Sequence, residues 1–484
     1  MTRPYLEEDY QTVSRSRARR RAWEKISDEL DVPVAAGKLR VTSTAATFPA
    51  APIDKSIALK RGHFLAFAGL FAFTVILYAR PSDFYPSALT ANLAFVVGVI
   101  TLAVYVPTQL ALEGKITAPL REVKLVLLFA LTGVASIPLA INRAEAWDTF
   151  SSAFVRCVVI FIVIVNVVRT ERRLNAMLYL ALGVGAWLSF GAINDYRLGL
   201  MTVEGYRAAG HGFGIFGNSN DMALFLVTMV PIAVALLMRS RRLFAKALFA
   251  AIALLMIAAI VLTYSRGGFI ALVVALAFLA WRFGKQHRAG ILLAGFAGVF
   301  AFLLLAPGGY GVRLASIVMP SLDPVGSSDA RRGELTRSLF VALRHPLLGI
   351  GMGNYAPEMS YRGLVTHNSY TQIAAEMGLA ALCFYTMFII GPLRRLRQLA
   401  RETLIVPQNS RFYYLSVGLQ AALIAYLVCS FFASVAYLWY VFYLVGYGVC
   451  LCRLYENETG KELAVEKRRS RASSLPAPQV LTAE

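Results

Sequence analysis

Charged residues are scarce in this chain of 484 residues, where Asp, Glu, Lys and Arg make up 16% and hydrophobic residues 57%. Soluble globular domains carry roughly 25% charged residues, so the composition excludes an ordinary soluble fold. Long alternations of apolar and polar residues, which mark the strands of membrane β-barrels, are also absent. The remaining class is a protein built from membrane-spanning helices.

Cysteine is also sparse, and this bears on disulfides and metal sites. The five cysteines all lie in apolar segments: Cys157, Cys383, Cys429, Cys450 and Cys452. An odd number with none in a loop argues against a disulfide framework, and the spacings do not fit a metal site. We interpret them as small packing residues and predict no metal centre.

The hydrophobic residues gather in blocks of roughly 17–22 residues, the length that crosses the hydrocarbon layer as a helix. Backbone groups inside lipid must hydrogen-bond within their own segment, so each block is predicted to be helical. The fold class is therefore all-α, a polytopic bundle of about 12 transmembrane helices. The predicted spans are residues 63–79, 88–106, 123–141, 151–168, 174–193, 219–238, 245–263, 267–282, 290–306, 372–391, 412–432 and 436–452.

The net charge of +20 is concentrated in the tails and in alternate connections. With a cytoplasmic N-terminus, every inner connection is rich in Lys and Arg, as the positive-inside rule requires. The transmembrane domain, 63–452, then lies between two cytoplasmic tails, 1–62 and 453–484, whose composition predicts disorder. The basic loops are too short to form a nucleic-acid-binding domain, so no nucleic-acid partner is expected.

The longest polar segment is the predicted outer loop of residues 307–371. It is predicted to contain a short helix that begins near Asp329, where Ser327 and Ser328 are placed as caps, and that ends before Pro346. We expect this helix to lie on the membrane surface or against the bundle. Its apolar face would consist of Leu335, Leu339, Ala342 and Leu343.

Three glycines at every second position follow that helix: Gly349, Gly351 and Gly353. No strand–turn–helix unit surrounds them, so they do not form a dinucleotide-binding fingerprint. They allow a tight backbone path, either as a structural turn or close to a ligand.

Two arginines mark the predicted outer face. Arg266 stands in a very short turn between two apolar helices, where an unpaired guanidinium is costly unless it meets an anion. Arg207 lies in the outer segment just before the sixth span. Taken alone it is an ordinary loop arginine, but guanidinium groups suit phosphate oxygens.

His367 and Asn368 stand at the mouth of the tenth span, at the end of the long outer loop. Histidine can accept a proton near neutral pH, and a positioned base helps a sugar hydroxyl to attack. Fixed cations can stabilise a departing diphosphate without a metal. The outer loops contain no Asp-x-Asp pair, which disfavours a metal-dependent glycosyltransferase.

Four segments together resemble the O-antigen ligase and polymerase family of polytopic membrane proteins. They are Tyr206–Asp221, Thr263–Gly268, Arg344–Tyr355 and His367–Leu379. The last segment has the ligase-type pattern of His-Asn, nine residues, then Gly. Ala381 departs from the family, which often has Gly, Thr or Tyr at that position. The resemblance extends best over residues 200–400.

The resemblance implies a metal-independent, inverting glycan transfer at the periplasmic face of the bacterial inner membrane, without a cofactor. The donor would be a glycan on undecaprenyl diphosphate. The acceptor would be lipid A-core in a ligase, or another glycan repeat in a polymerase of O-antigen or exopolysaccharide. Carried over to this sequence, Arg207 and Arg266 would bind the diphosphate, and His367 would activate the acceptor hydroxyl. A supporting role for Asn368, orienting His367, is inferred from adjacency alone.

Two alternatives come from other classes of protein. A twelve-helix transporter would usually show related halves and charged or broken helices near mid-membrane. A structural or assembly protein would leave Arg266 and His367 without a role. Ligation is the favoured interpretation within the family, because of the His-Asn spacing.

Overall fold

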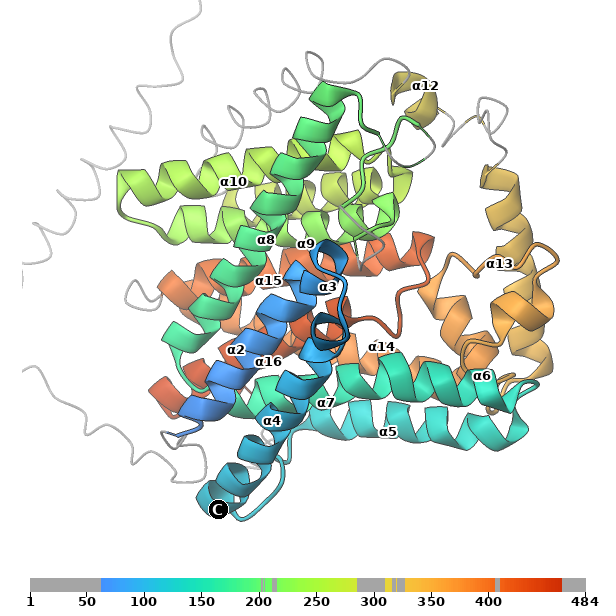
Figure 1. The fold of residues 1–484 in the computed structure, drawn as a ribbon. Coiled ribbons are helices and arrows are strands. Elements are labelled where there is room, and N and C mark those ends of the chain that lie inside the picture. Colours follow the sequence, from blue (N-terminus) through green and yellow to red (C-terminus); the bar gives the residue numbers. More distant parts are fainter. Residues whose placement is uncertain are drawn as a thin grey trace, which may run out of the picture. The chain divides into compact units, whose positions relative to one another are not determined.

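The computed structural model describes residues 62–201, 203, 205–210, 216–284, 310–315, 319, 327–404 and 410–463. These residues are helical or in connections, and the one β-type pairing among them is an isolated bridge between Val203 and Arg207. The all-α bundle expected from the sequence is thereby confirmed (Figure 1). The predicted span 290–306 and the predicted N-terminal tail up to residue 61 lie outside the described residues, as does the C-terminal tail from residue 464. The predicted disorder of the C-terminal tail was wrong for residues 453–459, which continue α16.

The helices follow the apolar blocks of the sequence. The longer ones are α2 (Phe64–Ala79), α4 (Ala88–Glu113), α5 (Arg121–Ser136), α7 (Val155–Val167), α8 (Glu171–Leu198), α9 (Ser219–Arg239), α10 (Leu243–Leu262), the helix Arg266–Gly284, α13 (Ser327–Arg344), α14 (Ser369–Leu404), α15 (Ser410–Cys429) and α16 (Trp439–Thr459). Short helical pieces are α3 (Pro81–Phe84), η1 (Ile137–Leu139), α6 (Arg143–Asp148), η2 (Thr149–Phe154), α12 (Tyr310–Ala315), η4 (Tyr355–Met359) and η6 (Ser430–Phe432).

Ten of the described helical segments are long and apolar enough to cross a membrane. They coincide with ten of the predicted spans. The predicted span 436–452 is α16, which differs in being rich in tyrosine and buried along its whole length from Tyr440 to Cys452. It packs against α7, α14 and α15 and continues to Thr459, past the predicted boundary.

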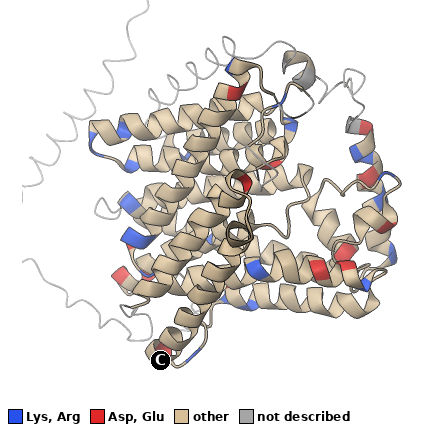
Figure 2. Ribbon diagram, viewed as in Figure 1, with Lys and Arg blue, Asp and Glu red and all other residues tan. Residues whose placement is uncertain are grey.

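Ion pairs between helices join the connections predicted to be cytoplasmic. Arg395 reaches Glu456 at 2.9 Å and Glu122 at 3.3 Å, and Arg169 reaches Glu113 at 2.7 Å. Charged residues are few along the middle of the helices (Figure 2). The predicted outer connections contact one another instead, and they hold all four candidate site residues. The amide N–H of Asn142, for example, donates to Oδ1 of Asn354.

The predicted helix of the long outer loop exists as α13 and packs against α14. Its predicted apolar face was wrong in part, because Leu339 and Leu343 are 48% and 72% exposed. The buried face instead presents Glu334, Ser338, Val341 and Ala342. Glu334 explains this orientation: its carboxylate accepts from the hydroxyls of Tyr355 at 2.8 Å and Ser360 at 3.0 Å. Ser327 and Ser328 lie within the helix rather than before it.

Candidate functional site

Arg207 lies in the connection between α8 and α9 and is buried, with 4% of its surface exposed. Its Nε donates to the carbonyl oxygen of Thr263 at 3.0 Å, and its Nη2 donates to Oδ1 of Asn220 at 2.9 Å. The next amide, of Ala208, donates to the carbonyl oxygen of Leu262. These bonds fix the guanidinium beside the turn that leads into Arg266.

Asn220, in the first turn of α9, ties the two arginine segments together. Its Oδ1 accepts both from Arg207 and, at 3.0 Å, from the hydroxyl of Ser265. That hydroxyl also accepts from the amide of Gly268 at 3.3 Å, which makes Ser265 the N-cap of the following helix. Tyr264 has a left-handed backbone, with φ of 50°, and its ring packs edge-on against Tyr206. The turn therefore has one well-defined conformation.

Arg266 is the first residue of the helix Arg266–Gly284 and is half-buried. The N-terminus of a helix attracts anions, because its first amide groups and its dipole present positive charge. The adjacent Gly267 packs against η6, where an added Cβ would lie 2.8 Å from Cβ of Phe432. Arg266 thus stands on a glycine-lined turn that is in contact with the segment after α15.

The same segment holds the loop that carries His367. Nδ2 of Asn368 donates to the carbonyl oxygen of Phe431 at 3.1 Å. The hydroxyl of Ser369 donates to the carbonyl oxygen of Ala433 at 2.7 Å. The hydroxyls of Thr366 and Ser434 are 2.8 Å apart and hydrogen-bonded. Residues 431–434 therefore contact both the Arg266 turn and the His367 loop.

His367 is half-buried and has a left-handed backbone, with φ of 52°. Such a conformation is uncommon for a residue other than glycine and tends to occur at functional sites. Burial, together with the nearby guanidinium of Arg331, lowers the pKa of the imidazole to about 4 from 6.5. The ring is therefore neutral at physiological pH and able to accept a proton.

Asn368 caps α14, and this bears on its predicted role. Its Oδ1 accepts from the amides of Tyr370 and Thr371 at 2.9 and 3.0 Å, while its Nδ2 binds Phe431. No side-chain bond from Asn368 to His367 occurs among the described residues. Any orienting effect therefore acts through the backbone, by fixing the start of α14 directly after His367.

A break in α14 binds the loop that contains Ile350 and Gly351 to the helix that follows His367. Gly378 has φ of 85° and ψ of 176°, a conformation essentially restricted to glycine. The break exposes the carbonyl oxygens of Ala375 and Glu376, and these accept from the amides of Ile350 and Gly351, each at 2.9 Å. The last residue of the His-Asn-x9-Gly pattern is thus the place where the loop is bound into the helix.

The three alternating glycines fit this junction as a structural turn. Each has a positive φ, and added Cβ atoms would collide with Glu376, Ala140 and Thr149 for Gly349, Gly351 and Gly353 respectively. The buried carboxylate of Glu376 accepts from the amide of Tyr355 at 3.2 Å and the hydroxyl of Tyr437 at 2.8 Å. The loop, the broken helix α14 and the segment before α16 are therefore connected at Glu376.

The structure brings the predicted residues to one end of the bundle and adds groups that the sequence did not single out. Asn220 was recognised only as part of a motif, although an asparagine at the start of an apolar helix signals a capping or bridging role. Ser434 and the carbonyl groups of 431–433 carry no signal of their own, because backbone acceptors cannot be recognised from residue identity.

Comparison with known families agrees with these features. Residues 251–386 match a protein family described as O-antigen ligase. The matched stretch contains the Arg266 turn, α13, the glycine segment and the His367 loop, whereas Arg207 and Asn220 lie before it. No curated protein matches the chain. The match supports the family assignment made from the four sequence segments.

Proposed function

We propose that this member of the O-antigen ligase and polymerase family transfers a glycan from undecaprenyl diphosphate to an acceptor hydroxyl at the periplasmic face of the inner membrane. The family match supports a role in glycan transfer in general. The favoured reaction is ligation to lipid A-core, and the same site would serve a repeat-unit polymerase if the acceptor were another glycan.

One observation carries the proposal: residues 431–434 contact both the turn of Arg266 and the loop of His367. Cationic groups and a neutral imidazole are thereby held at the same end of the bundle. Arg207 is bonded to that turn through Thr263 and Asn220. A donor with a diphosphate at the headgroup level would meet both kinds of group.

The chemistry follows from the charges. The guanidinium groups and the N-terminus of the helix Arg266–Gly284 would hold the diphosphate and stabilise the negative charge that grows as it leaves. The acceptor oxygen attacks the anomeric carbon from the side opposite the diphosphate. The bond from this carbon to the acceptor oxygen forms as the bond from the same carbon to the phosphate oxygen breaks. The hydroxyl proton passes to the imidazole of His367, and the configuration at the carbon is inverted.

The low pKa of His367 fits this sequence of events. Neutral imidazole is the form that accepts a proton, and burial with Arg331 keeps it neutral. A bound diphosphate would bring negative charge near the ring, which raises the pKa and strengthens the base. Donor binding would therefore prepare the base for the acceptor.

Deleting the gene and analysing the surface glycan tests the proposal. Loss of all capped lipid A-core would indicate a ligase. Lipid A-core with single repeats, or loss of a secreted polymer alone, would indicate the polymerase alternative. Unchanged glycans in the deletion strain would contradict both. Complementation with the intact gene must restore the glycan, and complementation with Arg266→Ala at equal membrane level must not.

A further inference from the structure

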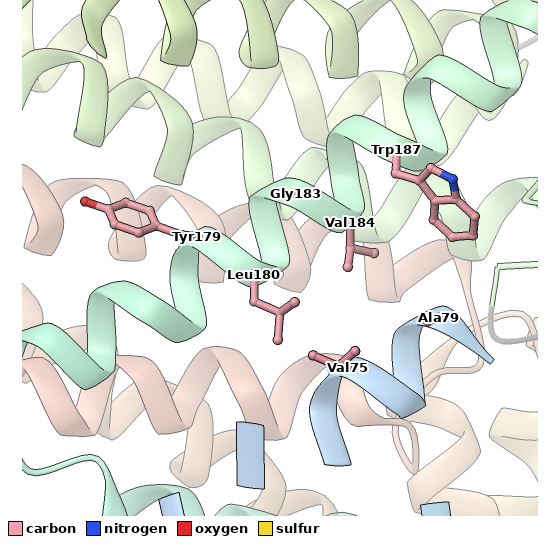
Figure 3. A pocket seen from close by; sticks show the side chains of 7 residues that line it. All are labelled: Val75, Ala79, Tyr179, Leu180, Gly183, Val184 and Trp187. Carbon is pink, nitrogen blue, oxygen red and sulfur yellow. The ribbon is translucent and has the colours of Figure 1, made fainter. Parts of the chain in front are cut away.

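An apolar groove of about 390 Å³ lies between α2 and α8 (Figure 3). Figure 3 shows Val75, Leu180 and Val184 between the two helices, with Tyr179 and Trp187 towards opposite ends. The volume falls in the range of about 300–1,000 Å³ typical of small-ligand pockets. Its lining residues are Val75, Ala79, Tyr179, Leu180, Gly183, Val184 and Trp187.

The groove opens outward from the bundle. Tyr179 and Trp187 are 48% and 46% exposed although both belong to a candidate membrane span. Gly183 is exposed too, and a Cβ added there would meet no atom within 4 Å. The lining carries no charge, so in a bilayer the natural occupant is a hydrocarbon chain.

One end of the groove adjoins the segment that holds Arg207. Leu188, next to Trp187, packs on Gly210, where an added Cβ would lie 3.3 Å from its Cδ2. On the other helix, the ring of Tyr78 lies 6.1 Å from that of Phe216. Gly210 and Phe216 are themselves joined, by a 2.8 Å backbone hydrogen bond. The groove thus runs from the hydrocarbon level to the loop that carries the candidate diphosphate ligand.

We infer that this groove binds the diphosphate-proximal part of the donor's polyprenyl chain. The inference rests on the proposed function, because it takes the diphosphate to lie at Arg207 and Arg266. An amphiphile with its diphosphate there needs an apolar path that begins at the same loop. From Tyr179 to Trp187 the helix rises about 12 Å, so the groove holds only part of a long chain and leaves the rest in lipid.

Filling the groove tests the inference. Gly183→Leu should fold, because a Cβ at this position meets no atom within 4 Å and leucine favours helix over glycine. Excluding about two methylene groups of the prenyl chain should raise KM for an undecaprenyl donor about tenfold. The rate with a donor whose diphosphate carries only a methyl group in place of the prenyl chain should change little. Gly284→Leu, at another helical glycine without neighbours within 4 Å, should leave both donors unaffected.

Photocrosslinking gives a reading that needs no turnover. A p-benzoylphenylalanine at Leu180 should capture radiolabelled undecaprenyl diphosphate in proteoliposomes, and the same group at Leu254, an exposed position on α10, should not. Capture that persists in excess phosphatidylethanolamine supports the inference. Capture lost to that lipid, or an unchanged donor preference in Gly183→Leu, overturns it and leaves an ordinary lipid groove. Capture without any transfer by the intact protein would count against the proposed function alone.

Discussion

The guanidinium Nε of Arg207 donates to the carbonyl oxygen of Thr263 over 3.0 Å. This bond joins the connection before α9 to the turn after α10, although the two residues lie 56 positions apart. The arginine is thereby held in place before any ligand arrives. Because the side chain is fixed, less entropy is lost when it binds an anion.

Substitutions of Asn220 separate the structural role of the hydrogen bonds around Arg207 from the electrostatic role of this site. Asn220→Asp keeps an acceptor for Arg207 and Ser265 but adds a negative charge beside the proposed diphosphate site. We expect near-normal thermal stability and a KM for the donor raised about tenfold or more. Asn220→Ala instead removes the acceptor and should destabilise the protein by about 1–3 kcal/mol. Equal donor KM in Asn220→Asp and the parent protein would remove the diphosphate from this position.

The lowered pKa of His367 gives an acid limit to activity. The imidazole must be neutral to act as a base, so activity is present above its pKa and is lost as the pH falls through it. We expect kcat/KM, which reports the free enzyme, to stay level from neutrality down to about pH 5. It should then fall around the pKa of about 4. Arg331→Gln should shift this acid-side loss of activity to higher pH, because it removes a cation that lowers the pKa of His367. A loss of activity centred at pH 6.5 in the parent protein would contradict the argument that burial lowers the pKa of His367.

The break in α14 makes a prediction about stability. Gly378→Ala should destabilise the protein by about 3 kcal/mol or more, because alanine avoids this backbone conformation and its Cβ would collide with the carbonyl oxygen of Leu347. Gly333→Ala, at an exposed position of α13 where an added Cβ meets no atom within 4 Å, should be neutral or stabilising by about 0.5–1 kcal/mol. Thermal unfolding in detergent distinguishes the two. Similar midpoints for both variants would mean that the break is not required.

The bond between Tyr437 and Glu376 can be tested with a matched pair of tyrosines. Tyr437→Phe leaves the buried carboxylate of Glu376 without one of its hydrogen-bond donors. The substitution should lower the free energy of unfolding by about 1–3 kcal/mol. Tyr447 is also buried, but its hydroxyl has no partner among the described residues. Tyr447→Phe should therefore be neutral or slightly stabilising. If the two variants melt alike, the tyrosine does not anchor α14 to the segment before α16.

The helices were predictable because lipid imposes a simple rule on sequence, a continuous apolar block for each span. The same continuity hid the break at Gly378, since the residues on either side are apolar and a helical glycine looks no different from a broken one. Leu339 and Leu343 predicted the wrong buried face of α13 because periodicity weighs apolar residues only. There the buried carboxylate of Glu334 and its two hydroxyl donors determine the orientation.

The candidate site was predictable to the extent that its chemistry resides in side chains. Arg266 and His367 stood out because charged or titratable groups at the mouth of a span are costly. Arg207, an ordinary loop arginine when taken alone, was assigned a role only through the resemblance to the family. The connection of these residues through Asn220 and the backbone of 431–433 was not predictable, because it depends on which loops meet at one end of the bundle. Sequence separation gives no guide to such contacts.

Reconstitution of the purified protein with a defined donor tests the central claim most directly. Proteoliposomes would contain a glycan on undecaprenyl diphosphate and lipid A-core, and release of undecaprenyl diphosphate would be measured together with glycosylated product. The intact protein should release both in equal amounts, with chelator present, while Arg266→Ala and His367→Ala, at unchanged melting temperature, should lose at least about a hundredfold in rate. Transfer at the parental rate by either variant would contradict the account.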